Sequence, residues 1–155
     1  MSAPFQITPD DLTALDVLEL LQLHLDEMYQ WSPADKVHAL PVDQLREPGV
    51  TFFAARDGTA LAAVGAMKQL DAERGEIKAM RANPTYRGKG AGEAILLHLL
   101  GEAKARGYQW LGLETGRTGP FQPAVNLYRK HGFAECESYA DYTADEFSQC
   151  MSKRL

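Results

Sequence analysis

The sequence lacks the features that would place it in several large classes of proteins. No apolar run approaches the roughly 20 residues that a membrane-spanning helix needs. The start, MSAPFQITPDDL, has no basic segment followed by an apolar one, so we expect no signal peptide. Only two of the 155 residues are cysteines, Cys136 and Cys150, and they form no metal-binding motif. We therefore expect a cytoplasmic protein with reduced thiols and no membrane association.

Positive charge is also scarce. The 16 Lys and Arg residues are outnumbered by 21 Asp and Glu, which gives a formal net charge of -5. We expect no nucleic-acid partner, and any bound anion has to be held by a local cluster. The four histidines do not follow the H-x-x-x-H spacing, so no metal site is expected. An apolar fraction of 45% is typical of a folded protein, and the length fits a single domain over residues 1–155.

The spacing of apolar residues predicts helices and strands in mixed order. It predicts a helix over residues 12–30, and Ser32 before Pro33 indicates a second, short helix running to about Leu40. Two β-prone runs flank Asp57 and Gly58, a pattern typical of a hairpin. The later predicted elements are a strand from 75 to 82, a helix that ends before 107, a strand over 108–115, a helix over 123–131, and strands near 133–136 and 147–153. This order predicts an α+β (mixed α/β) fold with helices on a central sheet.

The segment RGKGAG, residues 87–92, places three glycines and two cations directly before an apolar helix. A nucleotide-binding P-loop would need Ser or Thr after Lys89, where the chain has Gly90. The dinucleotide fingerprint G-x-G-x-x-G would need glycine in place of Glu93. A third pattern, R-G-x-G-x-G between a strand and a helix, is matched in full. The simplest alternative is a glycine-rich turn with solvated cations.

Through this loop the chain resembles the GCN5-related N-acetyltransferase (GNAT) superfamily, whose acetyl-CoA pattern is Q/R-x-x-G-x-G/A. EIKAMRANPTY is similar to that family's central strand, and AVNLYRKHGF is similar to its second motif, A-x-x-L-Y-x-x-x-G-F. These motifs cover roughly residues 76–133. The last third of the chain looks closest to a bacterial subgroup of small, uncharacterised acetyltransferases. The resemblance implies a central, mostly antiparallel, splayed sheet flanked by about four helices, with acetyl-CoA as co-substrate and no metal.

The chemistry of the loop favours a phosphate ligand independently of the family. The N-terminus of a helix leaves N–H groups unpaired and carries partial positive charge, and glycine lets a ligand approach the backbone. We expect a diphosphate to be bound by the loop, with Glu93 facing away from it. The expected cofactor-binding residues in the loop are Arg87, Gly88, Lys89, Gly90, Ala91 and Gly92.

The resemblance implies further cofactor contacts along the strand and the last helix. The strand of residues 76–82 should diverge from that of 109–115, and Met80 and Ala82 would offer backbone groups to the pantetheine arm. Many members carry asparagine where this chain has Phe121. We expect Asn126, or backbone groups near Pro123, to replace that contact.

Two residues are candidates for proton transfer. Tyr128 matches the family's tyrosine that protonates the leaving thiolate, and the alternative is a buried core tyrosine. Glu76 lies where one branch of the family carries a base for the amine. The alternative is a surface carboxylate paired with Lys78 or Arg74.

The expected activity is transfer of an acetyl group from acetyl-CoA to a primary amine of a small molecule, by direct attack on the thioester. A non-catalytic acyl-CoA-binding sensor on the same fold is the alternative. The protein is expected to be a monomer, or a homodimer through its edge strands. The residues expected to line the acceptor site are Met28, Trp31, Ser32, His38, Glu114 and Tyr142.

Overall fold

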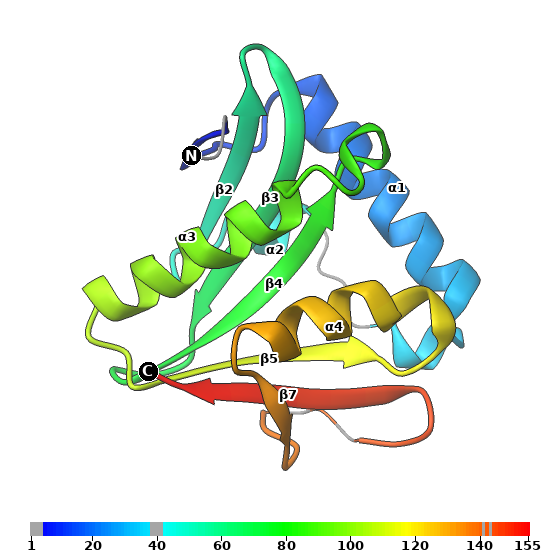
Figure 1. Ribbon diagram of the computed structural model, residues 1–155, viewed down its shortest axis with the longest axis vertical. Helices are drawn as coiled ribbons and strands as arrows, with labels where there is room; N and C mark the ends of the chain where they lie inside the picture. Colours follow the sequence, from blue (N-terminus) through cyan, green and yellow to red (C-terminus); the bar gives the residue numbers. More distant parts are fainter. Residues whose placement is uncertain (1–4, 38–41, 141, 143) are drawn as a thin grey trace.

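A single seven-stranded sheet organises the molecule (Figure 1). The computed structural model describes residues 5–37, 42–140, 142 and 144–155. The strands are β1 (Gln6–Pro9), β2 (Val50–Asp57), β3 (Ala60–Gln69), β4 (Arg74–Ala82), β5 (Trp110–Gly116), β6 (Ala134–Cys136) and β7 (Ser148–Arg154). Their order is β1-β2-β3-β4-β5-β7-β6, and neighbours are antiparallel except β4 and β5, which are parallel.

The helices pack on both faces of this sheet. The α-helices in the described residues are α1 (Leu15–Trp31), α2 (Val42–Leu45), α3 (Ala91–Ala105) and α4 (Gln122–Lys130). The predicted fold class, a mixed α/β structure with a mostly antiparallel sheet and about four helices, is therefore confirmed. None of the helices within the described ranges combines the length and the apolar character that crossing a bilayer requires.

The first helical region differs from the sequence-based prediction at two points. Residue Leu12, the predicted start, has a φ of 64° and donates its amide to Asp10 Oδ1 at 2.8 Å, so the chain turns there and α1 begins three residues later. Ser32 does not start a second helix. It is extended and ends α1, because its amide donates to Met28 O. A single 3-10 turn, Ala34–Lys36, follows and Val37 is extended, so the predicted helix is wrong up to Val37; residues 38–41 lie outside the described residues.

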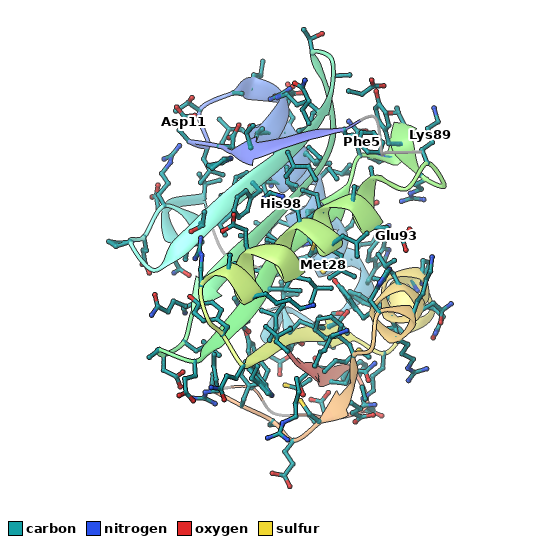
Figure 2. The ribbon with its side chains drawn as sticks, turned by 60° about the vertical axis from the view of Figure 1, so that its left-hand side comes forward. Phe5, Asp11, Met28, Lys89, Glu93 and His98 are labelled. Carbon is teal, nitrogen blue, oxygen red and sulfur yellow. The ribbon has the colours of Figure 1, made fainter. Side chains whose placement is uncertain are left out.

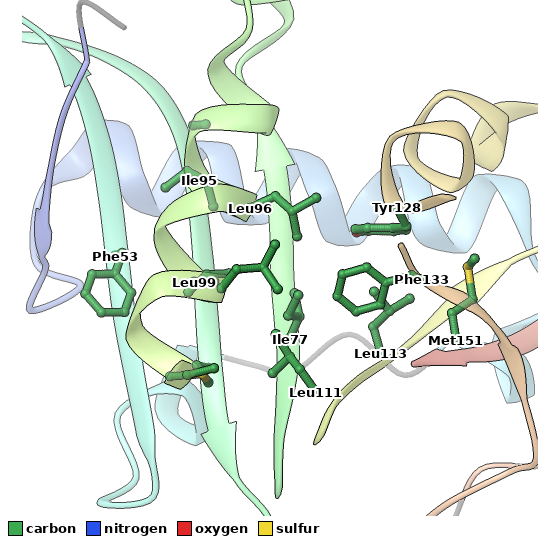
Figure 3. Close-up of a cluster of buried hydrophobic side chains, with 14 of the residues drawn as sticks. Phe53, Ile77, Ile95, Leu96, Leu99, Leu111, Leu113, Tyr128, Phe133 and Met151 are labelled. Carbon is green, nitrogen blue, oxygen red and sulfur yellow. The ribbon is translucent and has the colours of Figure 1, made fainter. Parts of the chain in front are cut away.

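The two faces of the sheet carry separate apolar cores. In β2, Phe53 packs beneath α3, where its ring contacts His98, whereas its neighbour Phe52 belongs to the core that contains residues of α1 and α2. This follows from the alternation of side chains along a strand. Figure 3 shows α3 in front of the strands and α1 behind them, with Leu99 of α3 over the sheet. Apolar residues on both faces hold the sheet between two helical layers.

β4 and β5 are paired only at their beginnings. Arg74, Gly75 and Glu76 pair with the segment 110–112 of β5, and no pairing follows between the two strands within the described residues. Beyond Glu76, β4 stays on β3 while β5 stays on β7, and Figure 1 shows the two strands diverging. The predicted splay is confirmed, and it leaves backbone groups of β4 free of any partner on β5.

Candidate active site

A cavity of about 950 Å³ occupies the space that the diverging strands leave. Its walls come from the loop before α3, the second halves of β4 and β5, one side of α4, and the C-terminal part of α1. Residues from distant parts of the sequence therefore line one continuous space. The glycine loop lies at one end of it.

The glycine loop enters α3 through two residues in the left-handed region. Gly88 has a φ of 73° and Gly90 a φ of 83°. This region costs other L-residues about 1–2 kcal/mol, so the local backbone requires glycine. A Cβ at either position would meet no atom within 4 Å, which means that the space beside the backbone is open.

Most of the amides in this loop are available to a ligand. The N–H groups of Gly88, Gly90, Ala91 and Gly92 have no acceptor in the part of the chain that the structure describes. These residues line the cavity, as does Arg87. Lys89 differs from them: its amide donates to Tyr86 O at 3.1 Å, and its Nζ lies 5.3 Å from the centre of the Tyr86 ring. Figure 2 shows Lys89 at the edge of the molecule, and the residue does not line the cavity.

β4 carries a bulge beside the cavity that the sequence analysis missed. The register passes from Val64 opposite Arg81 to Ala66 opposite Lys78, so two residues of β4, Ala79 and Met80, face Gly65 alone. Ala79 has a φ of 53°, and such local distortion is usual at a bulge. An isolated glycine in an apolar strand is the signal that could have revealed it.

The bulge directs the backbone of β4 into the cavity. Met80 and Ala82, both predicted to offer backbone groups, line it. The Met80 side chain turns toward α3, since a Cβ on Gly65 would lie 3.0 Å from Met80 Sδ and 2.5 Å from Ile95 Cγ2. Because Gly65 has no side chain, Ile95 of α3 and Met80 of the bulge can both pack against its backbone.

Tyr128 lies at the base of α4, where the cavity approaches the core. Its side chain is only 6% exposed, and its ring centre lies 5.9 Å from that of Phe133 (Figure 3). The residue lines the cavity, and its hydroxyl has no hydrogen-bond partner among the described residues. Burial raises the pKa of the phenol, so the hydroxyl keeps its proton throughout the physiological range. The side chain is thus buried yet has a proton to donate into the cavity.

Asn126 is not brought to the cavity. It lies on the exposed side of α4, where its Oδ1 accepts a hydrogen bond from Gln122 Nε2 at 2.7 Å. Phe121, at the position where family members carry asparagine, does line the cavity. Its ring packs edge-on against Trp31 at 5.6 Å and leaves no room for a Cβ at Gly116, which would lie 2.2 Å from Phe121 Cδ2. At this position the chain makes an aromatic contact between Phe121 and Trp31, where many family members carry a polar asparagine.

Glu76 is buried below the cavity floor and does not line it. Its side chain is 2% exposed, so the alternative is wrong in placing the carboxylate at the surface, whereas its expected pairing with Lys78 is present. Its Oε2 accepts a hydrogen bond from Tyr139 at 2.6 Å and lies 3.8 Å from Lys78 Nζ. Lys78 lines the cavity and donates to the Tyr142 hydroxyl. Burial lowers the pKa of Lys78, which brings its neutral form closer to neutral pH.

Five of the six residues predicted for the acceptor site line the part of the cavity away from the glycine loop. We call this part the distal lobe. The predicted residues that line it are Met28, Trp31, Ser32, Glu114 and Tyr142. The sixth, His38, lies outside the described residues.

Two further residues of the distal lobe were not predicted. Arg81, 9% exposed, forms an ion pair with Glu27 of α1, and its guanidinium lies 6.0 Å from the centre of the Trp31 ring. His24 also lines the cavity; burial, with the nearby Arg81 charge second, lowers its pKa to about 4. The alternation of side chains along EIKAMRA could have indicated the direction of Arg81. It places Arg81 on the face that packs against α1 only if the bulge at Ala79 and Met80 is taken into account.

Glu93 faces α4. Its Oε2 lies 2.8 Å from Lys130 Nζ and 2.6 Å from His131 Nε2 (Figure 2). These hydrogen bonds, the one from Lys130 first, lower the pKa of the carboxyl. The carboxylate that follows the glycine loop is therefore paired with the Lys130 cation and hydrogen-bonded to His131, which limits its repulsion of a bound anion.

Comparison with known proteins agrees with this geometry. Residues 16–133 match the model of the acetyltransferase (GNAT) family. The chain is 44% identical over 146 residues to a Bacillus subtilis (strain 168) protein named "Uncharacterized N-acetyltransferase YsnE", covering 94% of this chain and 97% of that protein. It is also 44% identical to the Escherichia coli (strain K12) protein "Uncharacterized N-acetyltransferase YedL", covering 97% and 95% of the two chains.

A solved structure has the same fold. A GNAT family acetyltransferase from Elizabethkingia anophelis, crystallised with acetyl-CoA bound, superposes with a TM-score of 0.73 over 99% of this chain and 100% of its own, at 19% identity. At that identity the likeness concerns the fold alone, whereas the family match and the two bacterial relatives cover most of the sequence. On these findings the chain belongs to the acetyltransferase (GNAT) family.

Proposed function

We propose that this protein transfers the acetyl group of acetyl-CoA to a primary amine of a small molecule, by direct attack of the amine on the thioester. The observation that carries the proposal is the cavity between β4 and β5, which connects the free amides of the glycine loop to the Tyr128 hydroxyl and then to the distal lobe. Free amides, an unpaired strand edge and a buried hydroxyl are the groups that would bind the diphosphate, the long thin arm and the thioester end of an acyl carrier.

The residues present fit such a donor. The amides of Gly88, Gly90, Ala91 and Gly92 bind the diphosphate at the positive end of α3, with Arg87 adding charge. Because β4 has no partner on β5 beyond Glu76, its backbone near Met80 and Ala82 hydrogen-bonds the arm as an added strand would. Asn126 has no part in this arrangement, since it lies outside the cavity.

The chain contributes to the chemistry at two points around the thioester. A backbone N–H at the bulge of Ala79 and Met80 stabilises the negative charge that develops on the carbonyl oxygen. Tyr128 donates its proton to the sulfur as the C–S bond breaks. Its burial and lack of a partner among the described residues support this assignment, because a hydroxyl committed to another acceptor would be less available.

The amine approaches through the distal lobe and has to lose a proton. Glu76 is the base in this scheme, but its carboxylate lies behind Lys78 and Tyr139. The proton therefore passes from the amine to the neutral form of Lys78 and from there to Glu76. The lowered pKa of Lys78 favours this route, because the side chain gives up its own proton more easily than an exposed lysine does.

The test measures release of the coenzyme A thiol with acetyl-CoA and a panel of small primary amines. We expect amine-dependent release, and Tyr128→Phe should reduce kcat by about 100-fold, the usual contribution of a general acid. The Kd of acetyl-CoA, measured by calorimetry, should stay within about twofold of the wild-type value, because the substitution removes no contact that binds acetyl-CoA. A twofold change is small compared with the tenfold change that about 1.4 kcal/mol of lost binding free energy would cause.

Two outcomes would contradict the proposal. If Tyr128→Phe leaves turnover unchanged, the tyrosine is not the acid. If acetyl-CoA binds but no amine in the panel, including amino acids and polyamines, increases thiol release, the protein is a binding module for acyl-CoA instead.

A further inference from the structure

The two cysteines, far apart in sequence, lie directly opposite one another in the sheet. Cys136 in β6 is paired in register with Cys150 in β7. Both are free thiols; Cys150 is 1% exposed and Cys136 is partly exposed. Opposed residues of antiparallel strands have Cα atoms about 4.5–5.5 Å apart, within the roughly 4.4–6.8 Å that disulfides span.

Their side chains share the face of the sheet that the distal lobe uses. Met151, the neighbour of Cys150, packs into the core below α3 and α4, so Cys150 points the other way. On β5, the residue opposite Cys150 is Glu114, which lines the distal lobe. Residues directly opposite in a ladder lie on one side of the sheet, so Cys136, Cys150 and Glu114 form a row.

The Cys150 sulfur is also in contact with the segment that covers this face. The backbone N–H of Tyr139 lies near that sulfur, and the Tyr139 hydroxyl donates to Glu76. The Tyr139 ring packs against Trp110 at 5.0 Å and against Tyr142 at 5.3 Å. Tyr142 in turn accepts the hydrogen bond of Lys78 and lines the distal lobe.

We propose that Cys136 and Cys150 form a reversible cross-strand disulfide, and that its formation alters the distal lobe through Tyr139. Hydrogen peroxide oxidises the partly exposed Cys136 thiol to a sulfenic acid and is reduced to water. The Cys150 sulfur then attacks the Cys136 sulfur, the S–S bond forms, and the sulfenic hydroxyl leaves with the thiol proton as a second water. A low-molecular-weight thiol reverses the change by exchange.

The disulfide changes two features around Tyr139. It fixes the start of the segment that follows Cys136, and it reorients the sulfur beside Tyr139. A shift of Tyr139 also moves Tyr142, which lines the distal lobe, and is expected to raise the KM of the amine about twofold to tenfold, the effect of about one lost hydrogen bond. The Kd of coenzyme A should not change, because residues 87–92 of the glycine loop precede α3 and belong to neither β6 nor β7.

The experiment oxidises the purified full chain with hydrogen peroxide and, separately, with oxidised glutathione. We expect the intact mass to fall by two hydrogen atoms, both thiols to resist alkylation under denaturing conditions, and a peptide pair joining residues 136 and 150. Tryptophan fluorescence should change, because Trp110 packs on Tyr139. A reducing thiol should restore the mass, the fluorescence and the KM of the amine.

Cys136→Ser is the matched control, since it keeps the buried Cys150 and touches no residue assigned to the reaction. The variant should show the same KM before and after treatment. Recovery of Cys136 as sulfinic acid or a mixed disulfide with Cys150 still free would overturn the proposal, as would a disulfide that leaves the fluorescence of Trp110 unchanged. Both readouts are independent of acetyl transfer, so they separate this proposal from the proposed function.

Discussion

Two glycines at opposite ends of α3 allow the proposed phosphate-binding role of the loop to be separated from its structural role. Gly90, the residue before α3, has a φ of 83°, and Gly107, just after its end, has a φ of 79°. A Cβ at either position would meet no atom within 4 Å. Gly90 lines the cavity and Gly107 does not. The substitutions Gly90→Ala and Gly107→Ala therefore impose the same backbone strain but differ in their distance from the ligand.

The expected magnitudes follow from the geometry. Alanine in the left-handed region costs about 1–2 kcal/mol in either variant. For a chain of this length, that lowers Tm by about 2–8 °C. In Gly90→Ala the added methyl group also occupies the space through which a diphosphate reaches the free amides. Loss of one hydrogen bond to a charged group costs about 1.5–3 kcal/mol, so the Kd of coenzyme A should rise about 10- to 100-fold.

The assay is isothermal calorimetry with coenzyme A, next to thermal unfolding of both variants in the absence of ligand. Gly107→Ala should bind coenzyme A like the wild-type protein while showing a similar loss of Tm. If Gly90→Ala binds as tightly as Gly107→Ala, the loop does not hold the diphosphate. If both variants lose affinity to the same degree, the effect comes from a destabilised α3 and not from contact with the ligand.

Three further predictions concern the distal lobe and the residues around it. Burial lowers the pKa of His24 from 6.5 to about 4, so its contribution to the free energy of unfolding is complete above pH 6.5 and is lost as the pH falls toward 4. Up to about 3 kcal/mol of stability is lost in this range. The substitution His24→Gln should therefore flatten the dependence of Tm on pH. Gly116→Ala should destabilise the protein by about 1–3 kcal/mol and raise the KM of the amine, because its Cβ would lie 2.2 Å from the buried Phe121 ring; an unchanged Tm by calorimetry would contradict this. Lys78→Met should lower kcat/KM for the amine about 100-fold without changing the Kd of acetyl-CoA, and an equal loss in both would assign Lys78 a structural role only.

Elements with strong local signals could be predicted from the sequence. The hairpin at Asp57 and Gly58 forms as expected, with Gly58 at a φ of 61°. α3 forms between the glycine loop and Gly107, because glycine at both ends supplies conformations that other residues avoid. The same local signals are the basis for proposing the glycine loop as a cofactor-binding site, since its pattern of glycines and cations is continuous in the chain.

Features that depend on distant segments could not be predicted in this way. Glu76 reads as a strand carboxylate next to Lys78, and nothing local indicates its 2% exposure. It is buried because Tyr139, 63 positions away, hydrogen-bonds it from a segment with no regular structure. The contact of Arg81 with Glu27 likewise joins β4 to α1 across 54 positions. Such contacts depend on tertiary packing rather than on local sequence.

The bulge in β4 links the fold of this strand to the chemistry of the cavity. In a regular strand, Glu76, Lys78 and Met80 would share one face, and Ile77 and Arg81 the other. Arg81 would then point into the apolar core beneath α3, where a guanidinium without a partner is strongly destabilising. The extra residue at Ala79 reverses the alternation, so Met80 joins Ile77 beneath α3 while Arg81 joins Lys78 on the α1 side. The same distortion turns the backbone toward the cavity. The bulge thus both keeps the charge of Arg81 out of the core and exposes backbone groups to the cavity, where we propose that the thioester lies.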